Sequence, residues 1–283
     1  MFKLRLENDS ANTIDINDGI NYEVLNCTGL NPPSASIFTA KSPNRKGLKY
    51  NGSTLNERNI VITIKILGDV EVNRNNLYPW IDTEQYVKIY YQNGIKNVYC
   101  EGHIQDCEIE LFTNSEVVNL AIICEDPYFK DLEEMSSEIS SLLKQFKFPF
   151  AIDSVGVPFS TMLDSNVVSV YNGGAETGAE IKITCNADIE NLIIFDADDT
   201  SRRFKLKTKL LKDWVVVIDG DGSPKTVKAY KPNGTVENLL KYVDNNPTWF
   251  TIKKGYNKFD FTADSGENYA DIQIIFHNKY LGV

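Results

Sequence analysis

The sequence is poor in the side chains that most often hold metal ions or carry catalysis. Histidine occurs only twice in 283 residues, as His103 and His277. The five cysteines form no CxxC pair, so a zinc site is not expected. A GxSxG element, a phosphate-binding loop and a dinucleotide-binding glycine pattern are also missing. These absences predict a protein that is not an enzyme and that uses no cofactor or metal.

Positive charge is also scarce. Lysine and arginine number 29 against 39 acidic residues, which gives a formal net charge of −10. A protein that grips nucleic-acid phosphates needs clustered cations, so this balance argues against such a role. An acidic surface does suit a protein that nucleic acid must pass without adhering.

Long apolar runs are missing as well. The first residues, MFKLRLENDS, contain no apolar core of signal-peptide length, and nothing approaches the ~20 apolar residues of a membrane helix. We therefore expect synthesis in the host cytoplasm, without a signal peptide and without membrane insertion. In that setting the cysteines are expected to be reduced and buried.

Strand patterns fill the first half of the chain. In RNIVITIKILG, which runs from Arg58 to Gly68, isoleucine occupies every second position from 60 to 66. Such alternation is typical of a strand with one buried face. Apolar runs on both sides of Asn93-Gly94 predict a β-hairpin, and a short helix is expected in VNRNNLYPWID, before Pro79.

The strand pattern stops at CEDPYFKD, residues 124–131. Pro127 has no backbone N–H group and cannot continue a central strand, and it restricts Asp126 to an extended conformation. Tyr128 and Phe129 are expected to pack this break against the preceding sheet. The segment thus predicts a seam between two halves of the molecule.

Beyond the seam, apolar residues recur at spacings of three and four from Leu132 to Phe146. This spacing predicts an amphipathic helix over about 131–146, with Asp131 as its N-cap. We take the helix as the end of an N-terminal domain of residues 1–148.

Residues 149–283 are again rich in short strand patterns, with a turn every eight to twelve residues. This spacing predicts a second domain with the fold of a β-sandwich or jelly roll. The chain is therefore expected to be mainly β, with one or two helices in its first domain.

Several residues could in principle have a catalytic or ligand-binding role, but a purely structural role explains the presence of most of them more simply. His103 lies near Asp106, yet it would need a nucleophile from elsewhere in the fold. The acidic runs at 196–199 and 219–222 lack the closing glutamate of a calcium loop, and tight turns account for them. Trp214 and Trp249 begin apolar runs and are expected in the core. Two facing carboxylates, as in a glycoside hydrolase, remain open because they meet only in the folded chain.

The order of these motifs resembles the distal tail proteins of long-tailed, siphovirus-like phages. The best motif is C-x-D-P-Y-F, carried by Cys124, Asp126, Pro127, Tyr128 and Phe129. The arginine-led strand from Arg58 to Gly68, the turn VLNCTGLNPP and the helix near LYPWID follow the same order. The resemblance covers most of the chain, although the second half matches by pattern more than by residue.

The resemblance implies a structural subunit of a phage, prophage or tail-like particle. It implies a homohexameric ring at the virion tail tip, closed by the N-terminal domains around a channel through which DNA passes. Galectin-like C-terminal β-sandwiches would carry neighbours in the baseplate and take part in host attachment. The expected partners are the tail tube protein, the tail-associated hub protein and the receptor-binding proteins. The turn-rich segment 31–56 is the candidate for an arm that reaches the next subunit.

Two other functions stay open at this point. A carbohydrate-binding protein would recognise host cell-wall polysaccharide through the β-sandwich and would show an exposed aromatic platform. A wall-degrading hydrolase would show a cleft with two facing carboxylates. The chain has no spare length for an added carbohydrate-binding insertion, and it lacks a hydrolase motif, so both rank below the ring subunit.

Overall fold

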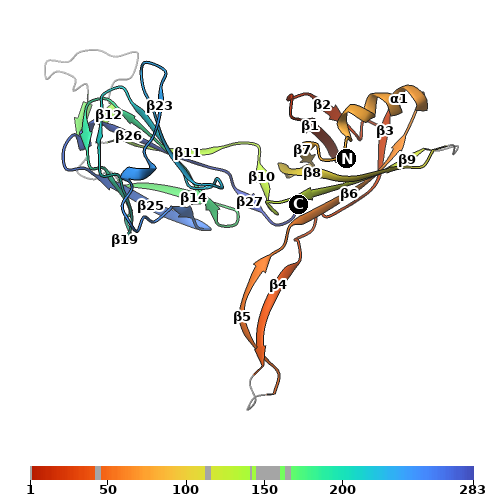
Figure 1. Ribbon diagram of the computed structural model, residues 1–283, viewed down its shortest axis with the longest axis horizontal. Helices are drawn as coiled ribbons and strands as arrows, with labels where there is room; N and C mark the ends of the chain where they lie inside the picture. Colours follow the sequence, from red (N-terminus) through yellow and green to blue (C-terminus); the bar gives the residue numbers. More distant parts are fainter. Residues whose placement is uncertain (1, 42–45, 112–115, 141, 145–159, 163–166) are drawn as a thin grey trace. The chain divides into compact units, whose positions relative to one another are not determined.

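The computed structural model describes residues 2–41, 46–111, 116–140, 142–144, 160–162 and 167–283, which form two compact units (Figure 1). Unit 1 consists of Met1–Leu132 together with Lys279–Val283, and unit 2 consists of Glu133–Asn278. The mainly β fold predicted from the sequence is confirmed. Within the described ranges, no helix has the length and apolar character needed to cross a membrane.

Unit 1 is an antiparallel β unit with one α-helix among its described residues. Its elements are β1 (Lys3–Asn8), β2 (Thr13–Asp15), β3 (Tyr22–Thr28), β4 (Ala35–Lys41), β5 (Leu48–Leu55), β6 (Arg58–Ile66), α1 (Val70–Leu77), η1 (Tyr78–Trp80), β7 (Tyr86–Gln92), β8 (Asn97–Ile109), β9 (Val117–Cys124), β10 (Phe129–Asp131) and β27 (Lys279–Tyr280).

The main sheet of unit 1 has the strand order β2-β1-β7-β8-β9-β6-β3, and β10 pairs with both β8 and β27. The isoleucines at 60, 62, 64 and 66 are at most 2% exposed, as the alternation in β6 predicts. After β6, Gly68 adopts a positive φ of 62° and the Asp69 carboxylate caps α1 by accepting the Val72 N–H. The predicted short helix and the hairpin around Asn93-Gly94 are both present.

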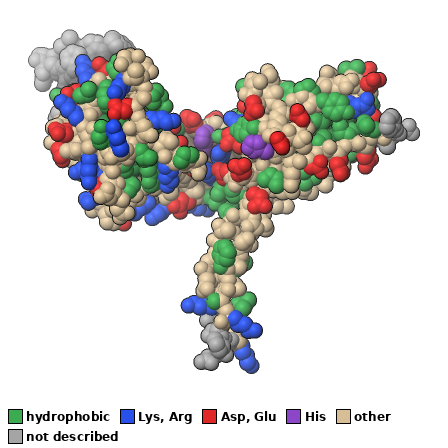
Figure 2. Space-filling view, viewed as in Figure 1, with side chains coloured by type: hydrophobic (Ala, Val, Ile, Leu, Met, Phe, Trp, Pro, Cys, Tyr) green, Lys and Arg blue, Asp and Glu red, His purple; other side chains and the backbone are tan. Residues whose placement is uncertain are grey.

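Strands β4 and β5 form a separate hairpin, which we call the arm (Figure 1). Every residue in the two strands is exposed except Gly52, which is partly exposed. The exposed side chains include large apolar ones: Ile37, Phe38, Leu48 and Tyr50 are 54% to 63% exposed. Exposed lysines at 41, 46 and 49 lie toward the far end of the arm, where Figure 2 shows a group of cationic side chains. The arm therefore exposes apolar and cationic groups that the described residues of unit 1 leave largely uncovered.

The helix predicted over residues 131–146 is wrong. Met135–Ser140 form β11, which pairs antiparallel with β26, and Leu142–Lys144 form β12. Residues 136–141 read SSEISS, and serine side chains compete with the hydrogen bonds of a helix. Pairing along β26 therefore outweighs the helical spacing of the apolar residues. Residues 145 and 146 lie outside the described part of the chain.

The division between the units also differs from the predicted boundary at 148/149. It lies between Leu132 and Glu133, because the expected terminal helix is instead a strand of unit 2. The chain then returns to unit 1 at Lys279. The sequence pattern gave no sign of that return.

Unit 2 is a β-sandwich. Its elements are β11 (Met135–Ser140), β12 (Leu142–Lys144), β13 (Ser160–Met162), β14 (Val168–Asn172), β15 (Thr177–Gly178), β16 (Glu180–Cys185), β17 (Ile189–Glu190), β18 (Ile193–Asp196), β19 (Asp199–Lys205), β20 (Lys209–Leu210), β21 (Val215–Asp219), β22 (Thr226–Tyr230), β23 (Val236–Asn238), η2 (Leu240–Tyr242), β24 (Thr251–Ile252), β25 (Gly255–Thr262), η3 (Glu267–Tyr269) and β26 (Ala270–Phe276).

Its two larger sheets have the orders β11-β26-β16-β21-β22-β23 and β14-β25-β18-β19. Alternate residues of both sheets enter one core, as in Ile181 and Ile183 of β16 and Phe259 and Phe261 of β25. The expectation of a sandwich in the second half therefore holds.

Candidate functional site

Unit 1 contains a buried arginine at the start of one of its strands. Arg58 is the first residue of β6, and it is only 1% exposed. In the β6–β9 register its partner is Cys124, the last residue of β9. The register thus brings together the first residues of two sequence motifs that were identified separately.

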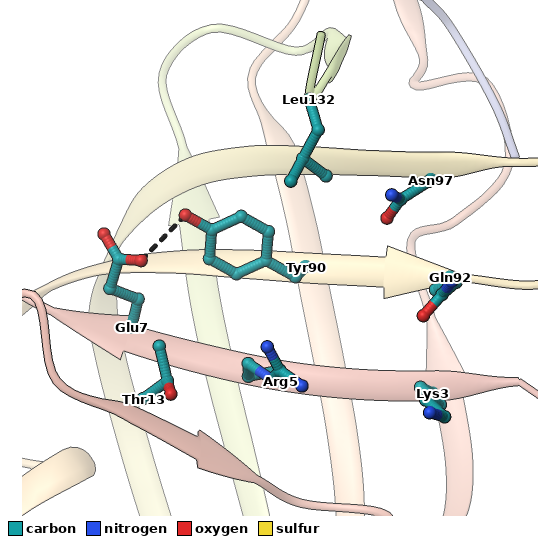
Figure 3. A pocket seen from close by; sticks show the side chains of 8 residues that line it. All are labelled: Lys3, Arg5, Glu7, Thr13, Tyr90, Gln92, Asn97 and Leu132. Atoms are coloured by element: carbon teal, nitrogen blue, oxygen red, sulfur yellow. Dashed lines mark hydrogen bonds between the residues drawn. The ribbon is translucent and has the colours of Figure 1, made fainter.

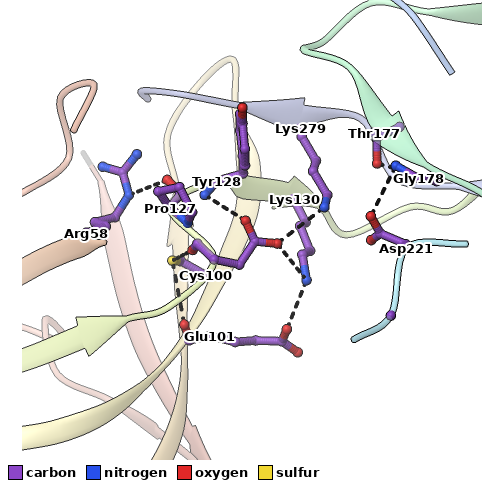
Figure 4. Close-up of polar contacts among 12 residues, drawn as sticks. Arg58, Cys100, Glu101, Pro127, Tyr128, Lys130, Thr177, Gly178, Asp221 and Lys279 are labelled. Atoms are coloured by element: carbon purple, nitrogen blue, oxygen red, sulfur yellow. Dashed lines mark hydrogen bonds and ion pairs between the residues drawn. The ribbon is translucent and has the colours of Figure 1, made fainter. Parts of the chain in front are cut away.

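The Arg58 guanidinium donates hydrogen bonds to four backbone carbonyls. Nε donates to Pro127 at 2.8 Å (Figure 4), and Nη2 donates to Leu281 at 2.7 Å. Nη1 donates to Asn31 at 2.8 Å and also to Gly29. These carbonyls belong to the turn after β3, to the seam and to the C-terminal segment. Because guanidinium carries five N–H donors in one rigid plane, a single side chain connects three distant parts of the chain.

Gly29 brings its carbonyl close to Arg58 because it lacks a side chain. Its φ is +85°, and a Cβ there would collide with the carbonyl oxygen of Asn59. Only glycine combines that backbone conformation with so close an approach to β6. The glycine of the VLNCTGLNPP turn therefore helps to build the arginine site as well as the turn.

Aromatic packing completes the Arg58 site. The Cζ atom of Arg58 lies 4.3 Å from the centroid of the Phe129 ring, and Phe129 is fully buried. Burial lowers the pKa of the Arg58 guanidinium, but arginine remains charged at neutral pH. Carbonyl dipoles and an aromatic face thus stabilise a permanent positive charge inside the unit.

Two thiols lie beside this charge. Cys100 and Cys124 are fully buried, and the Cys100 thiol donates a hydrogen bond to the Asp126 carbonyl at 3.9 Å. All five cysteines are free, in agreement with the expectation of reduced thiols, although Cys27 and Cys107 are only partly buried. Burial raises the pKa of the thiols of Cys27 and Cys107 to about 11, so both are protonated at neutral pH.

An ion-pair network surrounds the other motif residues. The Asp126 carboxylate accepts the Tyr128 N–H at 3.2 Å, which forms the turn, and it lies 3.3 Å from Lys279 Nζ and 3.5 Å from Lys130 Nζ. Lys130 also lies 3.0 Å from Glu101 (Figure 4). Burial alone would raise the pKa of Glu101, but Lys130, Tyr86 and Lys88 outweigh it and lower that pKa. The network therefore holds β8, β10 and β27 together electrostatically.

The C-terminal segment is docked by these groups. Lys279 and Tyr280 pair with β10, the Tyr280 hydroxyl donates to Asp131 at 2.9 Å, and the Val283 N–H donates to Leu30 at 3.2 Å. The Tyr280 ring also lies 3.1 Å from Lys96 Nζ. The last residues of the chain thus complete the first unit.

Most of the motif residues identified in the sequence come together here. Cys124, Pro127 and Phe129 contact or adjoin Arg58, while Asp126 and Tyr128 meet Lys279. Gly68 does not join them, because it follows the opposite end of β6. Sequence reasoning missed Lys130, Glu101 and the C-terminal residues, since no local pattern links them to the seam.

Each of the two histidines lies near a carboxylate. His103 Nδ1 lies 3.7 Å from Glu125, and His277 Nε2 lies 3.8 Å from Glu134. Over the described ranges, no three His, Cys, Asp or Glu side chains are placed to hold a metal ion. Trp214 and Trp249 pack against the core of unit 2, as expected. The runs at 196–199 and 219–222 are turns in which aspartates accept backbone N–H groups.

Comparison with known proteins gives this arrangement a context. Residues 172–280 match the family model of the siphovirus-type tail component, C-terminal domain. A search of curated proteins finds no match.

Solved structures match over the full chain. The crystal structure of SPP1 Dit (gp 19.1), a paradigm of hub adsorption apparatus in phages that infect Gram-positive bacteria, superposes with a TM-score of 0.69. It is 12% identical, and the match covers 99% of each chain. A chain of the phage P2 baseplate in its activated conformation with Ca matches with a TM-score of 0.53 and 13% identity over 100% of both chains. The phage p2 baseplate with Sr gives 0.51 and 12% over 98% of both chains.

These matches confirm the predicted resemblance and the galectin-like character of the sandwich. Residues 172–280 are thus similar to the siphovirus-type tail component, C-terminal domain, and the chain as a whole has the fold of SPP1 Dit.

Proposed function

We propose that this chain is a distal tail component, a structural hub in the baseplate of a siphovirus-type phage or a related tail particle. The observation that carries the proposal is the match to SPP1 Dit, which extends over 99% of both chains and thus includes both units. A structural hub also fits the Arg58 site, whose contacts serve to hold the chain together.

The proposed assembly is a homohexameric ring at the virion tail tip. Unit 1 closes the ring around a channel for DNA, and the sandwiches carry neighbouring proteins. The partners are the tail tube protein, the tail-associated hub protein and the receptor-binding proteins. The net charge of −10 supports passage of DNA without adhesion, because like charges repel.

The arm supplies a contact for ring closure. Ile37 and Phe38 of β4, and Leu48 and Tyr50 of β5, expose apolar surface that no described part of unit 1 covers. Exposed apolar groups of this size commonly mark protein interfaces. In the proposed ring they pack on the next subunit under cyclic symmetry.

The mass of the purified protein tests the proposal. Light scattering combined with negative-stain imaging should show a ring of about 190 kDa, six times the 32.0 kDa of one chain, with a central hole. Some ring proteins assemble only on a partner protein. If the purified chain is a monomer, it is therefore mixed with the tail tube protein and measured again. A monomer that stays at 32.0 kDa in that mixture would contradict the proposal.

One observation favours a second function, carbohydrate binding by the sandwich. Tyr171 and Tyr256 face each other across β14 and β25, are 54% and 78% exposed, and have ring centroids 5.0 Å apart. Exposed aromatic faces next to polar groups suit a partner that is itself part apolar and part polar. Binding of cell-wall polysaccharide that is lost in Tyr256→Ala would support this alternative.

A further inference from the structure

A second feature of unit 1 is a pocket on the polar face of its sheet. The pocket has a volume of about 320 Å³ and is open to solvent (Figure 3). This volume lies at the lower end of the range of small-molecule sites. Its lining residues are Lys3, Arg5, Glu7, Thr13, Tyr90, Gln92, Asn97 and Leu132.

The strand register builds this pocket. In the β1–β7 pairing, Lys3 lies opposite Gln92 and Arg5 lies opposite Tyr90, and residues directly opposite each other share a face of the sheet. Leu4 and Leu6 alternate with them and are fully buried on the other face. Leu132 lies at one side, where its N–H donates to the Asn97 carbonyl at 3.4 Å.

The charged side chains that line the pocket differ in whether they have a bonding partner in the described chain. Lys3 and Arg5 are exposed, and neither has an ion pair or side-chain hydrogen bond within the described chain. Glu7, in contrast, accepts the Tyr90 hydroxyl at 2.8 Å. Asp15 lies opposite Arg5 in the β1–β2 register, but its carboxylate accepts the Asn17 N–H and forms no ion pair with any described residue. Two cations are therefore available to a ligand.

The remaining polar side chains of the pocket can form hydrogen bonds with hydroxyl groups of a ligand. Thr13, Gln92 and Asn97 have no side-chain hydrogen bond to any described residue. Hydroxyl and amide side chains both donate and accept hydrogen bonds, as sugar hydroxyls do. The Tyr90 ring and Leu132 add an aromatic and an apolar wall.

We propose that this pocket binds a small hydroxylated ligand with one anionic group, the class of the sugar phosphates and sugar acids. Lys3 and Arg5 bind the anion, and the amides and Thr13 bind the hydroxyls. Two cations in a chain of net charge −10 are too few for the extended phosphate contacts of a nucleic acid. The site lies in unit 1, and its lining residues belong neither to the arm nor to the tyrosine pair in the sandwich.

Calorimetric titration of the full chain tests the proposal. The probes are glucose 6-phosphate, glucuronic acid, glucose and inorganic phosphate. Saturable binding is expected for one of the two anionic sugars, about tenfold tighter than for glucose or inorganic phosphate, because charged and neutral contacts act together. The preferred anionic sugar shows whether phosphate or carboxylate supplies the charge.

Substitutions of the lining residues test whether the anionic sugar binds in this pocket. Lys3→Gln with Arg5→Gln should weaken binding of the anionic sugar about tenfold, and Gln92→Ala with Asn97→Ala should remove the preference over inorganic phosphate. The matched control, Lys228→Gln with Arg203→Gln, changes two exposed strand cations of unit 2 and should bind as the native chain does. Tyr256→Ala should also bind normally.

Three results would overturn the proposal. One is the absence of saturable binding by either anionic sugar. Another is binding that Lys3→Gln with Arg5→Gln leaves unchanged. The last is equal binding of inorganic phosphate and glucose 6-phosphate. Because the four changed residues line an open pocket, thermal unfolding of each variant should match that of the native chain.

Discussion

At the scale of single residues, Arg58 connects three parts of unit 1 that are distant in the sequence. It is a buried cation whose acceptors in the described chain are backbone carbonyls, so its removal leaves several polar groups unsatisfied at once. It also touches Phe129, and thus joins the seam to the sheet. We therefore expect unit 1 to tolerate change at this position far less than at an exposed arginine.

Arg58→Lys tests that expectation. A lysine keeps the charge, but its single ammonium cannot reach acceptors spread around a planar guanidinium. The free energy of opening around the seam should fall by about 3 kcal/mol, which speeds hydrogen exchange of nearby amides roughly 100-fold. Exchange followed by mass spectrometry should show the change in residues 127–131 and 279–283.

Arg203→Lys, on the exposed face of β19, is the matched control and should leave exchange unchanged. Equal exchange in native chain and Arg58→Lys would mean that the carbonyls find other donors, and would refute the role assigned to Arg58.

The residues of this site differ in how far the sequence reveals them. Arg58 and the CEDPYF residues belong to recognisable motifs, so the sequence alone is enough to select both. Their mutual contact depends on the β6–β9 register, which no local pattern specifies. The bond from Arg58 to Leu281 spans 223 residues, and a two-residue strand at the chain's end carries almost no signal of its own.

At the scale of elements, β periodicity was the reliable signal and helical periodicity the misleading one. Alternating isoleucines predicted β6, and the Asn-Gly turn predicted the β7–β8 hairpin. The spacing after Asp131 predicted a helix where β11 pairs with β26. Edge pairing is a tertiary effect, so spacing within one segment cannot reveal it.

Strand β27 is the element whose removal should be most informative. Deletion of residues 279–283 removes the pairing to β10, the Tyr280–Asp131 hydrogen bond and one carbonyl acceptor of Arg58. Exchange in β10 and in the turn at 29–31 should therefore increase strongly, by mass spectrometry of the purified variant. Amides of β16 and β21 in unit 2 serve as the internal control and should exchange as before. An unchanged β10 would show that β27 only rests on a unit that is already complete.

At the scale of the whole molecule, the arm is the feature that internal packing does not explain. A compact unit gains no stability from a hairpin whose strand residues are nearly all exposed. Exposed strand edges and apolar side chains of this kind promote association with other chains, which is unfavourable for a protein that acts as a monomer. Their presence is understandable if association is the function, as in the proposed ring.

Charged substitutions in the arm test this link directly. Ile37→Asp and Leu48→Asp place a carboxylate at sites that are 63% and 61% exposed, so the monomer fold should keep its thermal transition. Burial of either carboxylate in an intersubunit contact is costly, so light scattering should show the 32.0 kDa chain in place of the ring. Val236→Asp, at a 54% exposed site in unit 2, is the control and should still form rings. If both arm variants assemble as the native chain does, ring closure must use another surface, and the arm must serve a different partner of the tail tip.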